Sequence, residues 1–217
     1  MRAFERICVV GLGYIGLPTA AILASRKVQV IGVDVNQTAV DTINQGKIHI
    51  VEPDLDIIVS STVNEGYLRA TTVPEVADAF LIAVPTPFTG ENHDPDLSYI
   101  KAACRSIAPV LKAGDLVILE STSPVGATEK MSEWLADVRS DLVFPHQSAA
   151  SHDISIAHCP ERVLPGKVLE ELIHNDRVIG GVTPQCAERA AALYRICLLY
   201  TSPSPRDRQK SRMPSSA

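Results

Sequence analysis

The sequence has 217 residues, and 46% of them are hydrophobic, so the chain can bury a sizeable core. The formal net charge of -5 argues against a nucleic-acid or anionic-membrane partner, because both usually require a basic surface. A small-molecule ligand is the better expectation. No apolar run reaches the roughly 18 residues that span a bilayer, and the N-terminus lacks a signal-peptide pattern, so we expect a cytoplasmic protein.

The cysteines and histidines are scattered along the chain. The five cysteines include no Cys-x-x-Cys pair, so neither a zinc site nor a disulfide framework is indicated. The six histidines include no i, i+4 pair beside a carboxylate. We therefore expect no metal, and we expect most of the cysteines to be small core residues. They are Cys8, Cys104, Cys159, Cys186 and Cys197.

The N-terminal segment alternates between strand and helix patterns. A β-branched apolar run at 6–10 ends at Gly11, as a buried parallel strand does. Alanine, leucine and isoleucine then recur at helical spacing over 14–26. A second apolar run at 28–34 and a helical pattern at 37–44 complete a β-α-β unit.

The alternation continues to residue 196, with no internal repeat. Apolar runs predict strands, and the segments between and after them predict helices. The strands are expected at 79–84, 116–119 and 154–158, and the helices around 98–111, 129–138 and 184–196. This order predicts one α/β domain over residues 1–196, a doubly wound, mostly parallel sheet of the Rossmann type with helices on both faces.

The last 21 residues differ in composition from the rest. Residues 197–217 are rich in proline, serine and arginine and show no periodicity, so we expect a disordered tail. This tail could be natural. The interpretation we favour is that it resembles a translated adapter sequence joined to a gene fragment, and that it does not belong to the natural protein.

A glycine-rich turn follows the first predicted strand. Gly11, Gly13 and Gly16 form G-x-G-x-x-G between a strand and a helix, where glycine permits a tight turn, a close approach to a pyrophosphate and close packing. Asp34 ends the second predicted strand, where an acidic residue binds ribose hydroxyls and repels a 2'-phosphate. The combination predicts NAD rather than NADP. The alternative is a glycine turn that only packs.

Three further segments follow predicted strands at the edge where open α/β sheets bind ligands. Thr86, between two prolines, either points at the cofactor or belongs to a rigid loop. The hydroxyl-rich segment 120–128 either binds the nicotinamide end or caps a helix. The segment 158–166 sets Glu161 beside Arg162, which by themselves favour an ordinary ion pair.

Together these segments resemble the UDP-glucose and UDP-N-acetylmannosamine dehydrogenase family over residues 1 to about 196. Within 159–166, Cys-Pro-Glu-Arg favours the N-acetylmannosamine branch, since glucose-specific relatives usually carry Asn-Pro-Glu-Phe there. The stretches that carry the resemblance are 11–20, 48–55, 83–88, 120–126 and 159–166.

The resemblance implies roles for particular residues. Besides the three glycines, NAD would be contacted by Tyr14, Ile15, Asp34, Thr86 and Thr128. Arg162 and Val163 would touch the UDP-sugar substrate. Thr122 and Glu161 would handle the catalytic water and the proton transfers.

The resemblance also implies a reaction. The family oxidises the C6 alcohol of a UDP sugar to a carboxylate in two hydride transfers to NAD, through cysteine-bound intermediates. The implied substrate is UDP-N-acetyl-D-mannosamine, and the product would supply surface polysaccharide. The family's nucleophilic cysteine and most of its UDP site lie in a later domain, so we expect this fragment to be inactive alone and the full-length protein to be a homo-oligomer. The alternatives are oxidation of another UDP sugar, glucose or N-acetylglucosamine, and an NAD-binding module without chemistry.

Overall fold

The computed structural model describes residues 4–90, 93–161, 163–164, 166–197 and 201–203. Within these residues, eight strands form the main sheet. They are β1 (Arg6–Val10), β2 (Gln29–Val33), β3 (Leu68–Thr71), β4 (Ala79–Ile82), β7 (Leu116–Leu119), β8 (Ser155–His158), β9 (Arg177–Gly181) and β10 (Thr201–Pro203). Their order across the sheet is β10-β9-β8-β7-β4-β1-β2-β3.

The sheet is parallel except at one boundary. β1 pairs in parallel with β2 on one side and with β4 on the other, and the parallel pairing continues through β7 to β8. β9 runs antiparallel to β8, with Ala157 opposite Gly181 and His158 opposite Gly180. The predicted doubly wound, mostly parallel α/β class is therefore confirmed.

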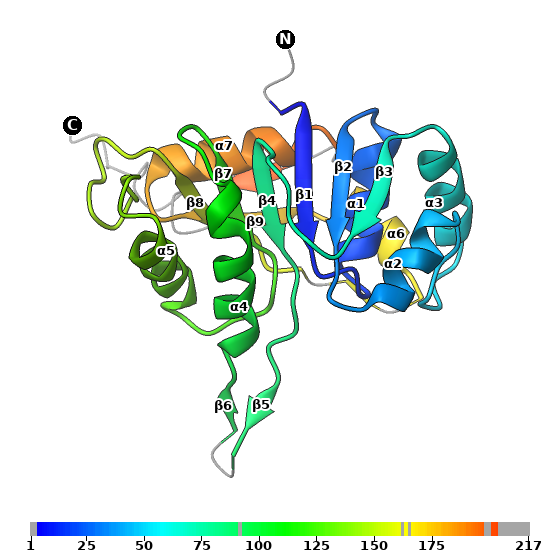
Figure 1. Cartoon of the computed structure of the whole chain (residues 1–217), viewed down its shortest axis with the longest axis horizontal. Helices are drawn as coiled ribbons and strands as arrows, with labels where there is room; N and C mark the ends of the chain where they lie inside the picture. Colours follow the sequence, from blue (N-terminus) through cyan, green and yellow to red (C-terminus); the bar gives the residue numbers. More distant parts are fainter. Residues whose placement is uncertain (1–3, 91–92, 162, 165, 198–200, 204–217) are drawn as a thin grey trace, which may run out of the picture.

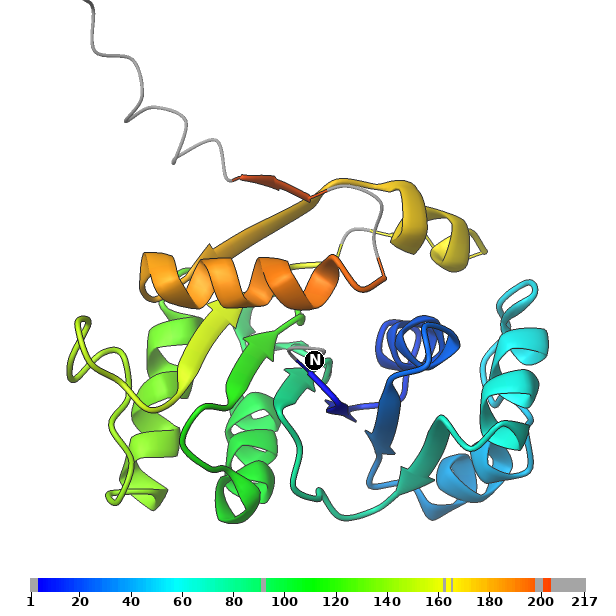
Figure 2. The same ribbon diagram turned by 90° about the horizontal axis from the view of Figure 1, so that it is seen from above.

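Helices cover both faces of the sheet, as Figure 2 shows from above. The helices of the chain are α1 (Gly16–Ser25), α2 (Gln37–Asn44), α3 (Leu55–Asn64), α4 (Ser98–Ile107), the short 3-10 helix η1 (Ala108–Val110), α5 (Ala127–Val138), α6 (Val168–His174) and α7 (Pro184–Tyr194). One face packs against α1, α2, α3, α6 and α7, and the other against α4 and α5. No helix among the described residues is long and apolar enough to cross a membrane.

Alternating side chains of each strand feed the two core layers. On β1, Ile7 and Val9 pack with α1, whereas Cys8 and Val10 pack on the side of α4 and α5. All four are buried because the strand lies inside the sheet with helices on both faces. This explains why the strand reads as a continuous apolar run instead of an alternating one.

Most predicted elements appear with boundaries shifted by a few residues. The helix predicted over 14–26 begins at Gly16, since the turn that precedes it extends through Ile15. The helix predicted over 37–44 has those bounds. Several elements were not predicted: α3, β3, α6, β9 and a small hairpin. Their apolar residues are too few, or too mixed with polar ones, to give a clear period.

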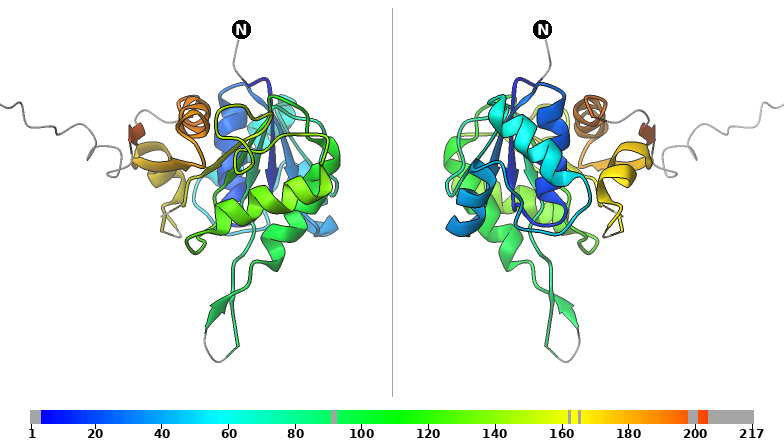
Figure 3. Two further views of the ribbon diagram at one scale, coloured as in Figure 1. Left: turned by 90° about the vertical axis from the view of Figure 1, so that its left-hand side faces the viewer. Right: turned by 90° about the vertical axis from the view of Figure 1, so that its right-hand side faces the viewer.

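The hairpin projects from the body of the molecule at the carboxyl edge of the sheet (Figures 1 and 3). It consists of β5 (Phe88–Thr89) and β6 (Asp94–Pro95), which pair antiparallel between β4 and α4. Phe88 is 69% exposed and contacts the His93 ring edge to face at 6.4 Å. The loop that carries Thr86 therefore continues outward instead of returning directly to the sheet.

The segment after α7 is described only in part. Cys197 is buried against the core, and Thr201–Pro203 forms β10, which pairs in parallel with the edge strand β9. Residues 198–200 and 204–217 lie outside the described residues. That residues 197–217 are a disordered, non-native tail therefore stays a prediction. Within this segment the structure describes Cys197 and the short strand β10.

Candidate functional site

The glycine turn between β1 and α1 is the tightest part of the sheet's carboxyl edge. Gly11 has a φ of +92°, and a Cβ there would lie 2.6 Å from the carbonyl oxygen of Ala83. A Cβ on Gly16 would overlap the backbone of Gly11, whereas one on Gly13 would meet nothing within 4 Å. Two glycines are thus required for packing, and the third faces open space.

The N-terminus of α1 is available to a ligand. Its N-cap residue, Ile15, makes no side-chain capping hydrogen bond, and no acidic residue lies in the first turn. Free backbone N–H groups and the helix dipole favour an anion at such a position. Tyr14 is 47% exposed beside this opening. An open glycine next to an uncapped helix start fits the pyrophosphate of a dinucleotide.

Asp34 lies directly against the glycine turn. One oxygen of its carboxylate accepts a hydrogen bond from the backbone N–H of Leu12, and the other accepts one from Asn36, both at 2.9 Å. These bonds hold the half-buried carboxylate at the end of β2, beside Gly13. A fixed anion here can accept ribose hydroxyls and would repel a 2'-phosphate, so the residues present fit NAD.

The loop after β4 is joined to the loop after β7. The Thr86 hydroxyl donates to the backbone carbonyl of Thr122 at 2.5 Å, and the Ser121 hydroxyl donates to the carbonyl of Val84 at 2.6 Å. A predicted cofactor residue and a predicted catalytic residue are thereby brought together. Thr122 is exposed, so it lies outside the core.

The segment 120–128 leads into the start of α5. The N-cap position is Gly126, with a φ of +89°, and no side chain caps the helix there. Thr128 lies half-buried in the first turn. The Ala127 N–H donates to the carbonyl of Pro124 at 3.1 Å, and no side chain caps the helix start, so the contact of Thr128 with the cofactor stays a prediction.

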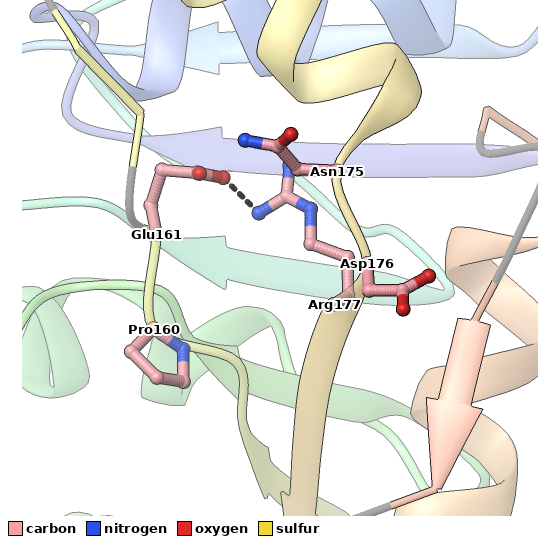
Figure 4. A pocket seen from close by; sticks show the side chains of 5 residues that line it. All are labelled: Pro160, Glu161, Asn175, Asp176 and Arg177. Atoms are coloured by element: carbon pink, nitrogen blue, oxygen red, sulfur yellow. Dashed lines mark ion pairs between the residues drawn. The ribbon is translucent and has the colours of Figure 1, made fainter.

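Glu161 follows β8 at the same edge. Its backbone N–H donates to the carbonyl of Glu120 at 3.3 Å, which places it next to the segment that carries Thr122. Its side chain is only 6% exposed and forms an ion pair with Arg177, which is 5% exposed (Figure 4). These two residues line a pocket of about 180 Å³ together with Pro160, Asn175 and Asp176. The described partner of Glu161 is thus Arg177 of β9, far along the chain, and an ion pair with the adjacent Arg162 lies outside the described residues.

The two predicted substrate residues follow Glu161. Arg162 lies outside the described residues. Val163 is half-buried and packs against the core layer that contains α1 and α6. The structure thus describes Val163 as partly structural, and the contact of both residues with a sugar nucleotide stays a prediction.

Glu52 lies in the stretch 48–55, which is part of the family resemblance. It is 4% exposed, and its carboxylate accepts hydrogen bonds from the backbone N–H groups of Gly166 at 2.9 Å and Val168 at 2.6 Å. These bonds anchor the far end of the 159–166 segment to the loop before α3. The sequence around Glu52 does not show that this side chain is buried, since both neighbours, Val51 and Pro53, are exposed in the structure.

None of the five thiols is placed to act as a nucleophile, because all are buried. Burial raises the pKa of Cys159, the cysteine nearest the crevice, to about 11. Burial likewise raises the pKa values of Cys8 and Cys104 to about 12. A thiol must be deprotonated to attack, so these residues are inert at neutral pH. Among the described residues, no three His, Cys, Asp or Glu side chains gather as a metal site.

Comparison with known proteins matches the part of the chain that contains the glycine turn and the main sheet. The profile of the UDP-glucose/GDP-mannose dehydrogenase family, NAD binding domain, matches residues 5–198. The UDP-N-acetyl-D-mannosamine dehydrogenase of Campylobacter jejuni is 68% identical over 196 residues, which are 90% of this chain and 48% of that protein. The NDP-N-acetyl-D-galactosaminuronic acid dehydrogenase of Ralstonia nicotianae is 70% identical over 193 residues, 89% of this chain and 45% of that protein.

Solved structures show the same architecture. A UDP-D-ManNAc dehydrogenase from Pyrococcus horikoshii superposes with a TM-score of 0.84 at 40% identity, covering 92% of this chain and 46% of that one. The UDP-N-acetyl-mannosamine dehydrogenase from Staphylococcus aureus gives a TM-score of 0.81 at 41% identity, covering 92% and 47%. The chain therefore spans about half the length of the curated relatives and of these structures.

Proposed function

This chain belongs to the UDP-glucose/GDP-mannose dehydrogenase family as its NAD binding domain, and on that premise we propose that it is the NAD-binding half of a UDP-N-acetyl-D-mannosamine 6-dehydrogenase. The observation that carries the proposal is the 68% identity to the Campylobacter jejuni enzyme of that specificity, which extends over 90% of the chain. The whole enzyme would oxidise the C6 alcohol of the sugar to a carboxylate.

The cofactor half of the site is built within the described residues. Gly13 and the start of α1 would hold the pyrophosphate, and Asp34 would bind the adenosine ribose and exclude NADP. Thr86 would border the nicotinamide end, where the loops after β4 and β7 are joined. NAD, when bound, supplies the hydride acceptor.

The chain's own residues would prepare the substrate end. Thr122, exposed at the end of β7, would position a water molecule through its hydroxyl. Glu161 would accept a proton at its carboxylate, which requires the ionised form at the working pH. Arg162 and Val163 would form one wall of the sugar-nucleotide site, and the other walls would come from the second half of the enzyme.

A second substrate is supported by a specific observation. The Ralstonia relative, named as an NDP-N-acetyl-D-galactosaminuronic acid dehydrogenase, is 70% identical to this chain. A single identity value over this half does not separate the two sugars, since the second half of the enzyme would contribute most of the sugar site. N-acetylmannosamine is placed first because several relatives at 66–68% identity are UDP-N-acetyl-D-mannosamine dehydrogenases. An N-acetylgalactosamine nucleotide is therefore the competing candidate.

The test is an assay of the full-length protein for NADH formation with four sugar nucleotides, the UDP forms of N-acetylmannosamine, N-acetylgalactosamine, N-acetylglucosamine and glucose. We expect the highest kcat/KM with UDP-N-acetyl-D-mannosamine and two NADH per sugar. A preference for any other sugar would replace the proposed substrate. Absence of NADH with all four, while NAD still binds, would favour an NAD-binding module without chemistry.

A further inference from the structure

Behind Glu161, the side chains of Glu120, Arg177 and Tyr194 form a buried polar cluster. It connects the ends of β7 and β8 and the start of β9 to α7. The antiparallel register of β8 and β9 pairs Ala157 with Gly181 and His158 with Gly180. Continued past the end of β8, the same register sets Glu161 opposite Arg177, the first residue of β9. The change from parallel to antiparallel at this boundary is therefore what brings a guanidinium to the carboxyl edge, where the other strand ends carry no cation among the described residues.

Arg177 is held from a second side. Its guanidinium lies over the ring of Tyr194, on α7, at 5.4 Å from the ring centroid. The Tyr194 hydroxyl donates to Glu120 Oε1 at 2.7 Å. Glu120 and Tyr194 are each 1% exposed, so this second tier is closed to water. Other titratable groups near the guanidinium, among the described residues, are Cys159 at the end of β8, Cys197 after α7 and Asp176, which lines the same pocket.

The cluster contains two carboxyl groups and one guanidinium. Burial raises the pKa of Glu120, which favours its neutral form. Its second oxygen, Oε2, is buried and has no hydrogen-bond partner among the described residues, an arrangement that is less costly for a neutral acid than for an anion. The positive charge of Arg177 is therefore balanced by the carboxylate of Glu161, with which it forms the ion pair.

We propose that Arg177 is a positioning residue that keeps the buried Glu161 carboxylate ionised and fixed at the crevice, while Tyr194 and Glu120 fix the guanidinium from behind. The participation of Glu161 in the reaction rests on the proposed function. The arrangement of the charges around Arg177 does not rest on the proposed function. An enzyme that needs a base in a water-poor site requires such a cation, because burial alone would protonate the carboxylate.

A merely structural ion pair makes a different prediction. Its loss would destabilise the fold, since one buried charge would be left without a partner. It would lower activity, if at all, by the same factor at every pH. A positioning residue changes the protonation of Glu161 itself, so the two roles are separated by titrating that one carboxyl group.

The first measurement uses the 217-residue chain and carboxyl-carbon NMR, with the Glu161 signal assigned by its loss in Glu161→Gln. In the wild type we expect Glu161 to be ionised throughout the neutral range. Arg177→Gln should raise the pH midpoint of its titration by about one unit or more, and Arg177→Lys should restore most of the difference. The matched control is Arg189→Gln, because Arg189 lies on α7 and binds the Gly114 carbonyl at the other edge of the sheet.

Three results would overturn the proposal. One is a Glu161 carboxyl that is protonated at neutral pH in the wild type, a measurement that needs no variant to fold. The other is an unchanged midpoint in Arg177→Gln. A midpoint that moves equally in Arg189→Gln would also assign the effect to general destabilisation.

The second measurement uses the full-length enzyme. Arg177→Gln should lower kcat about tenfold or more at neutral pH and move the acidic limb of the pH-rate profile upward, with the KM for NAD within about twofold of the wild type. A uniform loss at every pH would overturn the positioning role. If the full-length wild type oxidises no sugar nucleotide, the proposed function fails, and the NMR titration still decides the role of Arg177.

Discussion

A methyl group placed on Gly16 would lie 1.7 Å from the carbonyl oxygen of Gly11, far inside any permitted contact. Gly16 is fully buried where α1 approaches the end of β1. At Gly13, two residues along the chain from Gly11, the same methyl group would enter open space. Within one motif, therefore, one glycine is fixed by packing and another is free of any packing requirement of the protein itself.

This contrast predicts opposite outcomes for two alanine substitutions. Gly16→Ala should lower the free energy of unfolding by about 3 kcal/mol or prevent folding, because the contact is with backbone that cannot move aside. Gly13→Ala should leave stability within about 0.5 kcal/mol of the wild type and weaken NAD binding at least tenfold, since its Cβ would occupy the space of the pyrophosphate. Chemical denaturation and calorimetry measure the two effects. Unchanged NAD affinity in Gly13→Ala would place the cofactor elsewhere.

The cofactor preference should depend on the charge of Asp34. In Asp34→Asn the side chain keeps its shape and loses the charge that would repel a 2'-phosphate, so we expect NAD to bind more weakly and NADP relatively better. The ratio of the two affinities should fall about tenfold, which corresponds to about 1.4 kcal/mol. Calorimetry with both dinucleotides tests this.

The control for the Asp34 variant is Asp41→Asn, which removes a carboxylate from the surface of α2, where it accepts only a bond from Gln37. It should leave the ratio of NAD to NADP affinity unchanged. Tighter binding of NADP than of NAD by the wild-type chain would overturn the assignment of Asp34.

The layers of the fold were predictable because the central strands are buried on both faces. Continuous apolar runs such as Arg6–Val10 and Leu116–Leu119 leave no alternative to a sheet between helices. The edge elements were not predictable. β9 carries two glycines and an arginine, and it is set antiparallel by pairing with β8, which depends on contacts between distant segments.

The candidate site divides in the same way. Its NAD half is local in sequence, so Gly11 to Gly16 and Asp34 could be found from spacing alone. The partners of Glu161 and Glu52 could not, because Arg177 and the N–H group of Val168 reach them only through the folded sheet. A buried charge in the sequence shows that a partner is needed and does not show which one.

Glu52 should contribute to stability through two hydrogen bonds, a buried one from Val168 and a part-buried one from Gly166. Glu52→Ala leaves the N–H groups of Gly166 and Val168 without an acceptor, and we expect the free energy of unfolding to fall by about 3 kcal/mol. The control is Glu171→Ala, which removes the acceptor of the Leu164 N–H in an exposed loop and should change stability by less than about 1 kcal/mol. Urea denaturation measures both. Equal losses would mean that burial does not strengthen the Glu52 bonds.

The protonation of Glu120 predicts a pH dependence of stability. Burial raises its pKa above the usual 4.5, and the opposing effects of Arg177 and the Tyr194 hydroxyl only partly offset this. Between the unfolded and the folded pKa the folded state binds more protons, so this contribution to stability is present at low pH and is lost as the pH rises above about 4.5. Glu120→Gln does not ionise and should lack that decline.

The measurement is the unfolding free energy of the wild type and of Glu120→Gln from pH 4 to pH 8, a range of about four units around the expected change. The difference should grow in favour of the variant, by at most about 1.4 kcal/mol per pH unit. Glu133→Gln, on the exposed face of α5, is the control and should follow the wild type. Parallel curves for wild type and Glu120→Gln would show that Glu120 is ionised in the folded protein.

The 217-residue chain itself should bind NAD without completing the reaction. A second hydride transfer needs a thiolate that holds the aldehyde. Burial raises the pKa of Cys159 to about 11, and the nearby Arg177 guanidinium offsets this only in part. The purified chain should therefore give a binding isotherm with NAD and no UDP-aminouronic acid by mass spectrometry. Cys159→Ala should leave NAD affinity unchanged, because Asp34 and the glycine turn are built from other elements. Detection of the uronate from the wild-type chain, and its loss in Cys159→Ala, would identify Cys159 as the nucleophile against this expectation.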